Sequence, residues 1–150
     1  MLTVRLQAEI FDAGTETNTF LRDCGGAGAA VTFTGLVRSL PGQAIEALEL
    51  EHYPAMAQKT LTALGEKAMD RFGLMRLTII HRFGRLLPEE PIVQVMALSA
   101  HRQAAFDGAN FVMDVLKTDA PFWKKETAGG KEDWVGAKSE DDFARDRWQK

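Results

Sequence analysis

Hydrophobic and polar residues alternate along several short stretches of the chain, a pattern typical of β-strands with one buried face. Even spacing places Val4, Leu6 and Ile10 on one side of a first strand. Four further strands are predicted at residues 29–38, 45–53, 74–82 and 92–100. The stretch 92–100 is apolar on both faces, which is typical of a strand in the centre of a sheet.

Apolar residues at helical spacing predict two long helices. The first begins at Pro54 and ends at Gly73, and its buried face is formed by Ala57, Leu61, Leu64 and Ala68. The second follows His101, and its core face is expected to be formed by Phe106, Ala109, Met113 and Leu116. The change from a period of two to a period near 3.6 separates these helices from the strands around them.

Capping residues predict two shorter helices. Asp12 can cap a helix that runs to residue 22, because its side chain can accept a hydrogen bond from a free backbone N–H group. Ser139 and Asp142 form an S-x-x-D start for a last helix that continues through Trp148.

Glycine and proline mark the connections. The stretch 83–91 contains two prolines and is predicted to be a loop. The glycine-rich stretch 25–28 contains neither a Walker lysine nor a GxGxxG pattern, so we interpret it as a flexible turn rather than a phosphate-binding loop. A turn at 128–131 allows 133–136 to pair back on the strand before it as a hairpin.

Together these elements predict a single α+β domain over residues 1–150, without repeats or a linker. The length suffices for a substantial core, and 45% hydrophobic with 26% charged residues is typical of a globular protein. The formal net charge of -3 argues against a general nucleic-acid-binding surface, although it still permits a local basic pocket.

The cysteine and histidine content narrows the chemistry further. Cys24 is the only cysteine, so no internal disulfide can form, and we favour a small-residue role over a nucleophilic one. His52, His81 and His101 are scattered rather than paired, so we expect no metal site. Neither a signal peptide nor an apolar run of about 18 residues is present, and we expect a soluble, cytoplasmic protein without membrane contact.

The stretch 116–126 combines a helix end with two lysines. Pro121 ends the helix that carries Lys117, and the aromatic pair after it predicts a strand, so Lys117 and Lys124 can face each other across a corner. Two ammonium groups brought close lower each other's pKa, which would let one act as a base or nucleophile near neutral pH. The alternative is a pair of solvated lysines favoured by the helix macrodipole.

Three further residues are candidates for an anion site. Arg38 ends a predicted strand, and its guanidinium fork suits a phosphate, although it could also be an ordinary surface charge. His101 and Arg102 stand where a strand gives way to a helix, and unpaired backbone N–H groups there can bind anions. The alternative for His101 is a capping or packing role.

Four stretches, read together, resemble the large, catalytic subunit of molybdopterin synthase. They are VTFTGLVR (31–38), LEHYPAM (50–56), SAHR (99–102) and LKTDAPFWK (116–124). Their order and spacing fit this family from about residue 29 to 135. Each stretch alone is a weak signal, whereas the set of four is specific.

The resemblance implies an α/β-hammerhead fold with an additional small antiparallel β subdomain. It also implies a homodimer within a heterotetramer, in which a small ubiquitin-like carrier subunit binds at each end. The carrier's C-terminal Gly-Gly thiocarboxylate would donate sulfur to cyclic pyranopterin monophosphate, and two transfers would form the dithiolene of molybdopterin. No metal or redox cofactor is implied for this step.

The resemblance also assigns residues. Lys117 and Lys124 match the two catalytic lysines of the family. The implied substrate-binding residues are Val37, Arg38, His101, Arg102, Lys125, Glu126 and Lys138. Two positions depart from the family pattern: Leu36 stands where some members carry a lysine, and Lys138 stands where the family can offer an arginine across the dimer interface. A lysine keeps the charge there but loses the bidentate fork.

Two other functions use the same residues differently. A phosphoester hydrolase or transferase would employ the same cations without a protein partner. A non-catalytic module that docks a peptide tail would need only an apolar groove and the aromatic pair Phe122-Trp123, and both lysines would be dispensable. The four family stretches favour the synthase.

Overall fold

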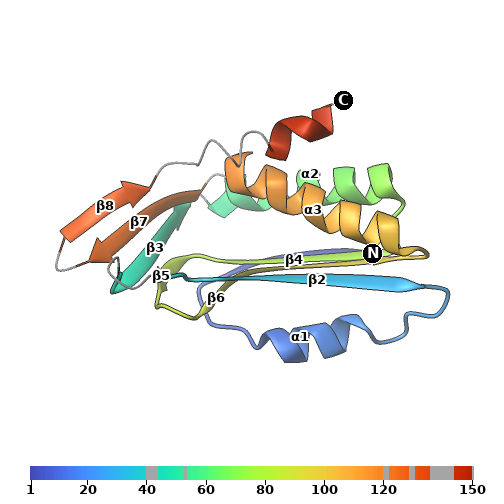
Figure 1. Cartoon of the computed structure of the whole chain (residues 1–150), viewed down its shortest axis with the longest axis horizontal. Helices are drawn as coiled ribbons and strands as arrows, with labels where there is room; N and C mark the ends of the chain where they lie inside the picture. The colour runs from blue at the N-terminus through green and yellow to red at the C-terminus, as the bar shows by residue number, and fades with distance from the viewer. Residues whose placement is uncertain (40–43, 53, 120–121, 129–130, 136–143, 150) are drawn as a thin grey trace.

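Two four-stranded β-sheets form the framework, and helices cover both faces of the larger one (Figure 1). The structure is a computed structural model that describes residues 1–39, 44–52, 54–119, 122–128, 131–135 and 144–149. The α+β class is confirmed, and the second sheet is the small antiparallel subdomain expected beside the α/β-hammerhead.

The larger sheet has the strand order β1-β4-β6-β2. Its strands are β1 (Leu2–Gln7), β2 (Ala29–Leu36), β4 (Arg76–Arg82) and β6 (Pro91–Ser99). β1 and β4 are parallel, whereas the β4–β6 and β6–β2 pairs are antiparallel. The prediction of a central strand is confirmed, because β6 lies inside the sheet and residues 93–99 are buried.

Helices pack on both faces of this sheet. α2 (Pro54–Phe72) and α3 (Arg102–Asp119) cover one face, and α1 (Ala13–Phe20) covers the other (Figure 1). Leu77 and Ile79 of β4 belong to the core under α2 and α3, while Ile80 joins the smaller core under α1. The predicted buried face of α2 is confirmed, and the helix ends at Gly73, whose φ of +62° suits glycine.

The smaller sheet has the order β5-β3-β7-β8. Its strands are β3 (Ala47–His52), β5 (Gly84–Leu86), β7 (Phe122–Ala128) and β8 (Lys131–Val135), and β7 and β8 form the predicted hairpin. The prediction that 83–91 is only a loop was wrong, because it contains β5. Leu86 is fully buried against Leu48 and Leu50, and this packing stabilises a strand too short to show alternation.

Phe106 does not belong to the core, contrary to the sequence prediction. Its side chain is 54% exposed, whereas Ala109, Met113 and Leu116 on the same helix are buried. Phe106 borders a groove between α3 and β2, and β2 is an edge strand of the sheet. Within the described residues, the sheet therefore offers no further strand to cover this aromatic ring.

The turn prediction for 25–28 is confirmed. The backbone of Gly28 donates a hydrogen bond to the Ser99 carbonyl oxygen at 3.0 Å. A Cβ atom at this position would lie 2.2 Å from the Ala100 carbonyl oxygen. Gly28 is therefore required for the close approach of two backbone segments.

The C-terminal part is only partly described. Ser139 and Asp142, predicted to start the last helix, lie outside the described residues. Residues 144–146 are helical, and Arg147–Gln149 form the 3-10 helix η1.

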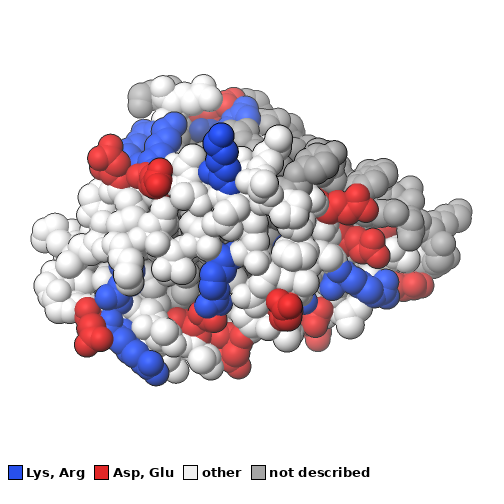
Figure 2. Space-filling model, turned by 180° about the vertical axis from the view of Figure 1, so that it is seen from behind, with Lys and Arg blue, Asp and Glu red and all other residues white. Residues whose placement is uncertain are grey.

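The described surface carries charges of both signs. Figure 2 shows Lys and Arg interspersed with Asp and Glu over the rear face, without a continuous basic area among the residues drawn in colour. Within the described chain, none of the helices has the length and apolar character needed to cross a membrane.

Asp12 is the N-cap of α1, as its sequence position predicted. Its Oδ1 accepts a hydrogen bond from the Thr15 backbone N–H at 2.8 Å. This bond lowers the pKa of Asp12 below the ordinary value of 3.8. A carboxylate with a lowered pKa stabilises the fold above the pKa of the unfolded chain, and this stabilisation is lost as the pH falls through the folded pKa.

We therefore expect Asp12→Ala to lower the free energy of unfolding at neutral pH, with a deficit that shrinks below about pH 4 as the wild-type carboxylate is protonated. Urea denaturation at neutral and acid pH measures this difference. Asp12→Asn is the control, because an amide oxygen can still cap the helix without titrating. A deficit of Asp12→Ala that stayed constant with pH would contradict the account.

Candidate functional site

A cavity of about 650 Å³ lies where the end of β2 meets the C-terminal half of α3 and the wall of the smaller sheet. It is lined by residues 33–39, Leu50, His81, Glu89, 92–93, Met113, Leu116 and Lys117. The apolar part of this wall comes from β2, β3, β6 and α3, and its charges come from the cations Arg38 and Lys117 and the acid Glu89. A cavity with apolar walls and a few convergent polar groups is the usual form of a ligand site.

Backbone pairing beyond the end of β2 determines where Arg38 lies. The Val37 N–H donates to the Glu90 carbonyl oxygen at 2.9 Å, and the Glu89 N–H donates to the Val37 carbonyl oxygen at 2.9 Å. Val37 is 2% exposed and packs with Leu50. Successive residues of an extended chain point to opposite sides, so Arg38 is exposed next to a buried Val37.

A buried arginine secures the segment that pairs with Val37. The guanidinium of Arg82 donates to the carbonyl oxygens of Ala8, at 3.0 and 3.2 Å, and of Pro91, at 3.0 Å. It also lies 3.7 Å from the Glu90 carboxylate. These bonds satisfy a charge that is only 4% exposed and hold the 90–91 backbone against β4.

Lys117 reaches the cavity from the last turn of α3. Met113 and Leu116 are buried against the sheet, and their packing sets the rotation of the helix about its axis. Lys117 is exposed beside them and lines the cavity. Among the described residues, neither Lys117 nor Arg38 forms an ion pair with an acid, so both cations are available to an anionic ligand.

β7 pairs with β3, the strand that supplies Leu50 to the cavity wall. In the register of β3 and β7, Lys124 is opposite Leu50 and Lys125 is opposite Glu49. The backbone of Lys124 therefore lies on the strand next to this part of the wall. The side chains of Lys124 and Lys125 lie outside the described part of the structure, whereas Glu126 is half-buried. Lys138 lies outside the described residues altogether.

His101 and Arg102 lie at the opposite end of α3 from Lys117. Arg102 begins the helix and Lys117 lies in its last turn, so about 22 Å of helix separates them at about 1.5 Å per residue. Both residues are exposed, and neither lines the cavity. One chain therefore does not bring the expected substrate-binding residues into a single pocket.

A second, shallower groove of about 320 Å³ runs between β2 and α3. It shares Phe33, Met113 and Lys117 with the cavity and therefore lies next to it. Its far part is bordered by the exposed Phe106. The two hollows are neighbours along α3.

Sequence reasoning did not identify His81 as a cavity residue. His81 is 5% exposed, and its Nδ1 donates to the Arg82 carbonyl oxygen at 2.8 Å. The sequence did contain a signal, because His81 is evenly spaced from Leu77 and Ile79 and so faces the same side of β4 as these core residues. The pairing of His81 with Val93 of β6, which the spacing did not reveal, was needed to place it in the cavity.

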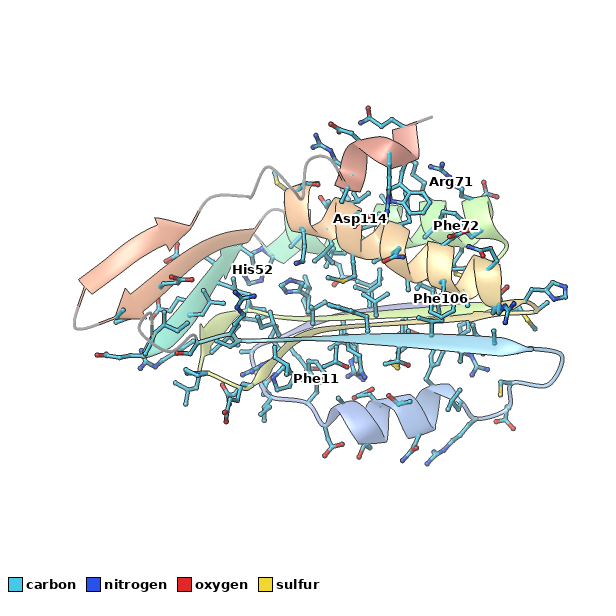
Figure 3. All side chains as sticks on the ribbon, in the orientation of Figure 1. Phe11, His52, Arg71, Phe72, Phe106 and Asp114 are labelled. Carbon is cyan, nitrogen blue, oxygen red and sulfur yellow. The ribbon has the colours of Figure 1, made fainter. Side chains whose placement is uncertain are left out.

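His52 lies near the junction of the two sheets, at the end of β3 (Figure 3). Its ring stacks on that of Phe83 with 4.1 Å between centroids, and burial lowers its pKa. The described part of the chain contains no group of three or more His, Cys, Asp or Glu residues that could hold a metal ion.

Comparison with known proteins identifies the family. A family model described as MoaE protein matches residues 6–119. The molybdopterin synthase catalytic subunit of Rhizobium meliloti is 54% identical over 149 residues, which cover 98% of this chain and 96% of that protein. The catalytic subunit of Cereibacter sphaeroides is 52% identical over 147 residues, or 98% of this chain and 100% of that protein.

Solved structures share the fold. The molybdopterin biosynthesis MoaE protein of Burkholderia ambifaria has a TM-score of 0.84 and 44% identity, and the match covers 100% of this chain and 99% of that one. A protein-protein complex of subunits 1 and 2 of the Helicobacter pylori molybdopterin-converting factor contains a chain with a TM-score of 0.73 and 20% identity, and 89% of each chain is covered. The family model and the nearly full-length relatives show that the chain belongs to the MoaE protein family, that of molybdopterin synthase catalytic subunits.

Proposed function

We propose that this protein is the catalytic subunit of a molybdopterin synthase. It transfers sulfur from the C-terminal thiocarboxylate of a small ubiquitin-like carrier to cyclic pyranopterin monophosphate and so forms the dithiolene of molybdopterin. The observation that carries this proposal is the cavity in which Arg38 and Lys117 stand without an acidic partner among the described residues, in a chain of this family. Both substrates carry negative charge, which these cations can bind.

The cavity suits a flat heterocycle that carries a phosphate. Val93, Met113 and Leu116 supply an apolar wall against which a pterin ring can be buried. Arg38 at the rim offers a planar fork of N–H donors for the cyclic phosphate. A ligand bound in this way would place its phosphate at the exposed end of the cavity and its ring in the interior.

Lys117 is the residue proposed to act in the chemical step. It lines both the cavity and the β2–α3 groove, so both substrates could reach it there. It would transfer a proton or transiently accept the carrier's acyl group. Lys124 would steer the thiocarboxylate from the adjacent strand, and Lys125 and Glu126 would extend the substrate-lining wall.

The groove between β2 and α3 is the proposed path of the carrier's tail. A Gly-Gly terminus has no side chains, so its backbone can lie close to Phe33 and Met113 and deliver the thiocarboxylate to Lys117. The structural neighbour from Helicobacter pylori is a complex of two subunits, which supports a second protein as a component.

A second copy of the chain would complete the pocket. If two copies pack with their α3 helices antiparallel about a two-fold axis, the start of one helix lies beside the end of the other. His101 and Arg102 of one copy would then face Lys117 and Arg38 of its partner. The exposed Phe106 lies along this helix face, and its burial between the copies would stabilise the dimer. Lys138 would also contribute across this interface.

Replacing Lys117 with Ala distinguishes sulfur transfer from the alternative of a non-catalytic docking module. We expect Lys117→Ala to lower turnover by about a hundred-fold to ten-thousand-fold, because a proton-transfer group is lost. Its affinity for the carrier, measured by titration calorimetry, should remain near that of the wild type. Lys59→Ala, which removes an exposed lysine of α2, is the matched control and should keep full activity.

Full activity of Lys117→Ala would refute the catalytic assignment and favour a docking module. Phosphoester cleavage by the wild type without any carrier would favour the partner-independent hydrolase or transferase instead.

Complementation between two inactive variants tests the composite pocket. If each pocket takes Lys117 from one chain and Arg102 from the other, a heterodimer of Lys117→Ala with Arg102→Ala contains one pocket in which both residues are intact. We expect a heterodimer purified through two tags to recover about half of the wild-type rate. The control pairs Lys117→Ala with Arg38→Ala and should stay inactive, because both residues line the cavity of the same chain. No recovery with Arg102→Ala would exclude the shared site.

A further inference from the structure

Arg147 and Trp148, near the C-terminus, pack on α2 and α3 directly above the core. The indole of Trp148 packs edge-on against Phe72, at 5.6 Å between centroids, and against Phe111, at 5.7 Å. Arg71 donates to the Trp148 carbonyl oxygen at 2.7 Å. Figure 3 shows Arg71, Phe72 and Asp114 gathered beneath the C-terminal helix. These contacts join the end of the chain to both helices.

Asp114 of α3 forms the polar part of this attachment. Its Oδ2 accepts a hydrogen bond from the indole Nε1 of Trp148 at 2.6 Å. The same oxygen forms an ion pair with the Arg147 guanidinium at 2.7 Å. The side chain is only 16% exposed, so these bonds are partly shielded from water. We call Asp114, Arg147 and Trp148 the C-terminal clamp.

Asp114 has a second possible partner in Lys117, three residues further along α3. Residues three apart on a helix have Cβ atoms about 5–6 Å apart, and opposite charges at this spacing attract each other. Both side chains border the groove between β2 and α3. In the structure the carboxylate is bound by the clamp, and Lys117 forms no ion pair with any described residue.

We propose that Asp114 is a positioning residue for Lys117 and that the C-terminal clamp controls it. By binding the carboxylate, Trp148 and Arg147 keep its negative charge away from the Lys117 ammonium. Lys117 is thereby left free for an anionic ligand in the cavity. The effect of the C-terminal clamp on turnover rests on the proposed function, whereas its effect on the Lys117 amine does not.

A double variant releases the carboxylate with little loss of packing. Trp148→Phe keeps an aromatic ring and removes the indole N–H, and Arg147→Gln removes the ion pair. The freed Asp114 is then expected to pair with Lys117 and to lower kcat about two- to fivefold with little change in KM, the size expected of a partly exposed ion pair. Adding Asp114→Asn should restore kcat, because an amide cannot form that ion pair.

The rescue distinguishes positioning from a merely structural role. If the clamp only stabilised the fold, Asp114→Asn would not restore the rate of the double variant. Asp146→Asn is the matched control, because it breaks an exposed ion pair with Arg145 in the same segment without affecting Asp114. It should leave kcat unchanged. Thermal unfolding of each variant verifies that the chains compared are folded.

Amine labelling followed by mass spectrometry tests the clamp without any turnover. With limiting reagent, the labelling of Lys117 relative to Lys59 should fall about two- to fivefold in the double variant and recover with Asp114→Asn. Unchanged labelling, or a fall that Asp114→Asn does not reverse, would overturn the clamp proposal. Failure of the proposed function would appear separately, as an active Lys117→Ala variant with the labelling pattern intact.

Discussion

The packing of α3 against the larger sheet is the constraint on which the site depends. Val112, Met113 and Leu116 are buried against β-strands whose own side chains are buried on both faces of the sheet. Interiors of this kind are close-packed, so the helix can neither rotate nor slide without creating voids, and a large-to-small change there costs about 2–5 kcal/mol. The packing of α3 in the core therefore fixes where Lys117 lies, and Lys117 needs no strong contact of its own.

The same rigidity explains how the cavity can hold Arg38 and Lys117 without an ion pair to any acid that the structure describes. Arg38 is held by the backbone bonds of Val37 to the 89–90 segment, which the buried Arg82 secures in turn. Lys117 is held by its helix, and the nearby Asp114 is occupied by Trp148 and Arg147. Glu89 also lines the cavity, but it forms no ion pair with Arg38 or Lys117. An anionic substrate can then bind these two cations without first breaking an ion pair with a described residue.

Local patterns predicted most of the elements, because each depends on spacing within one segment. The buried face of α2, the Asp12 cap, the central position of β6 and the β7–β8 hairpin all have this character. β5 was missed because the burial of Leu86 depends on Leu48 and Leu50, far away in the sequence. Phe106 was assigned to the core because helical spacing does not show where a sheet ends.

The site was less accessible to sequence reasoning, since it is made of long-range contacts. The stretches that resemble the family identified Arg38 and Lys117, and the fold brings both to one cavity. Sequence reasoning placed His101 and Arg102 at the start of the helix that carries Lys117 near its end, and the structure confirms this. It did not draw the consequence that the length of this helix keeps them out of the cavity of the same chain. His81 was overlooked because only the long-range pairing of β4 with β6, which sets it opposite Val93, makes it part of the cavity.

Reconstitution from three purified components tests the central claim most directly. The protein is mixed with a thiocarboxylated carrier and cyclic pyranopterin monophosphate, and molybdopterin is followed through its fluorescent oxidation product. The account predicts product only when all three are present. Product without the thiocarboxylate, or no product with a carrier shown to bind, would contradict the assignment of this cavity to sulfur transfer.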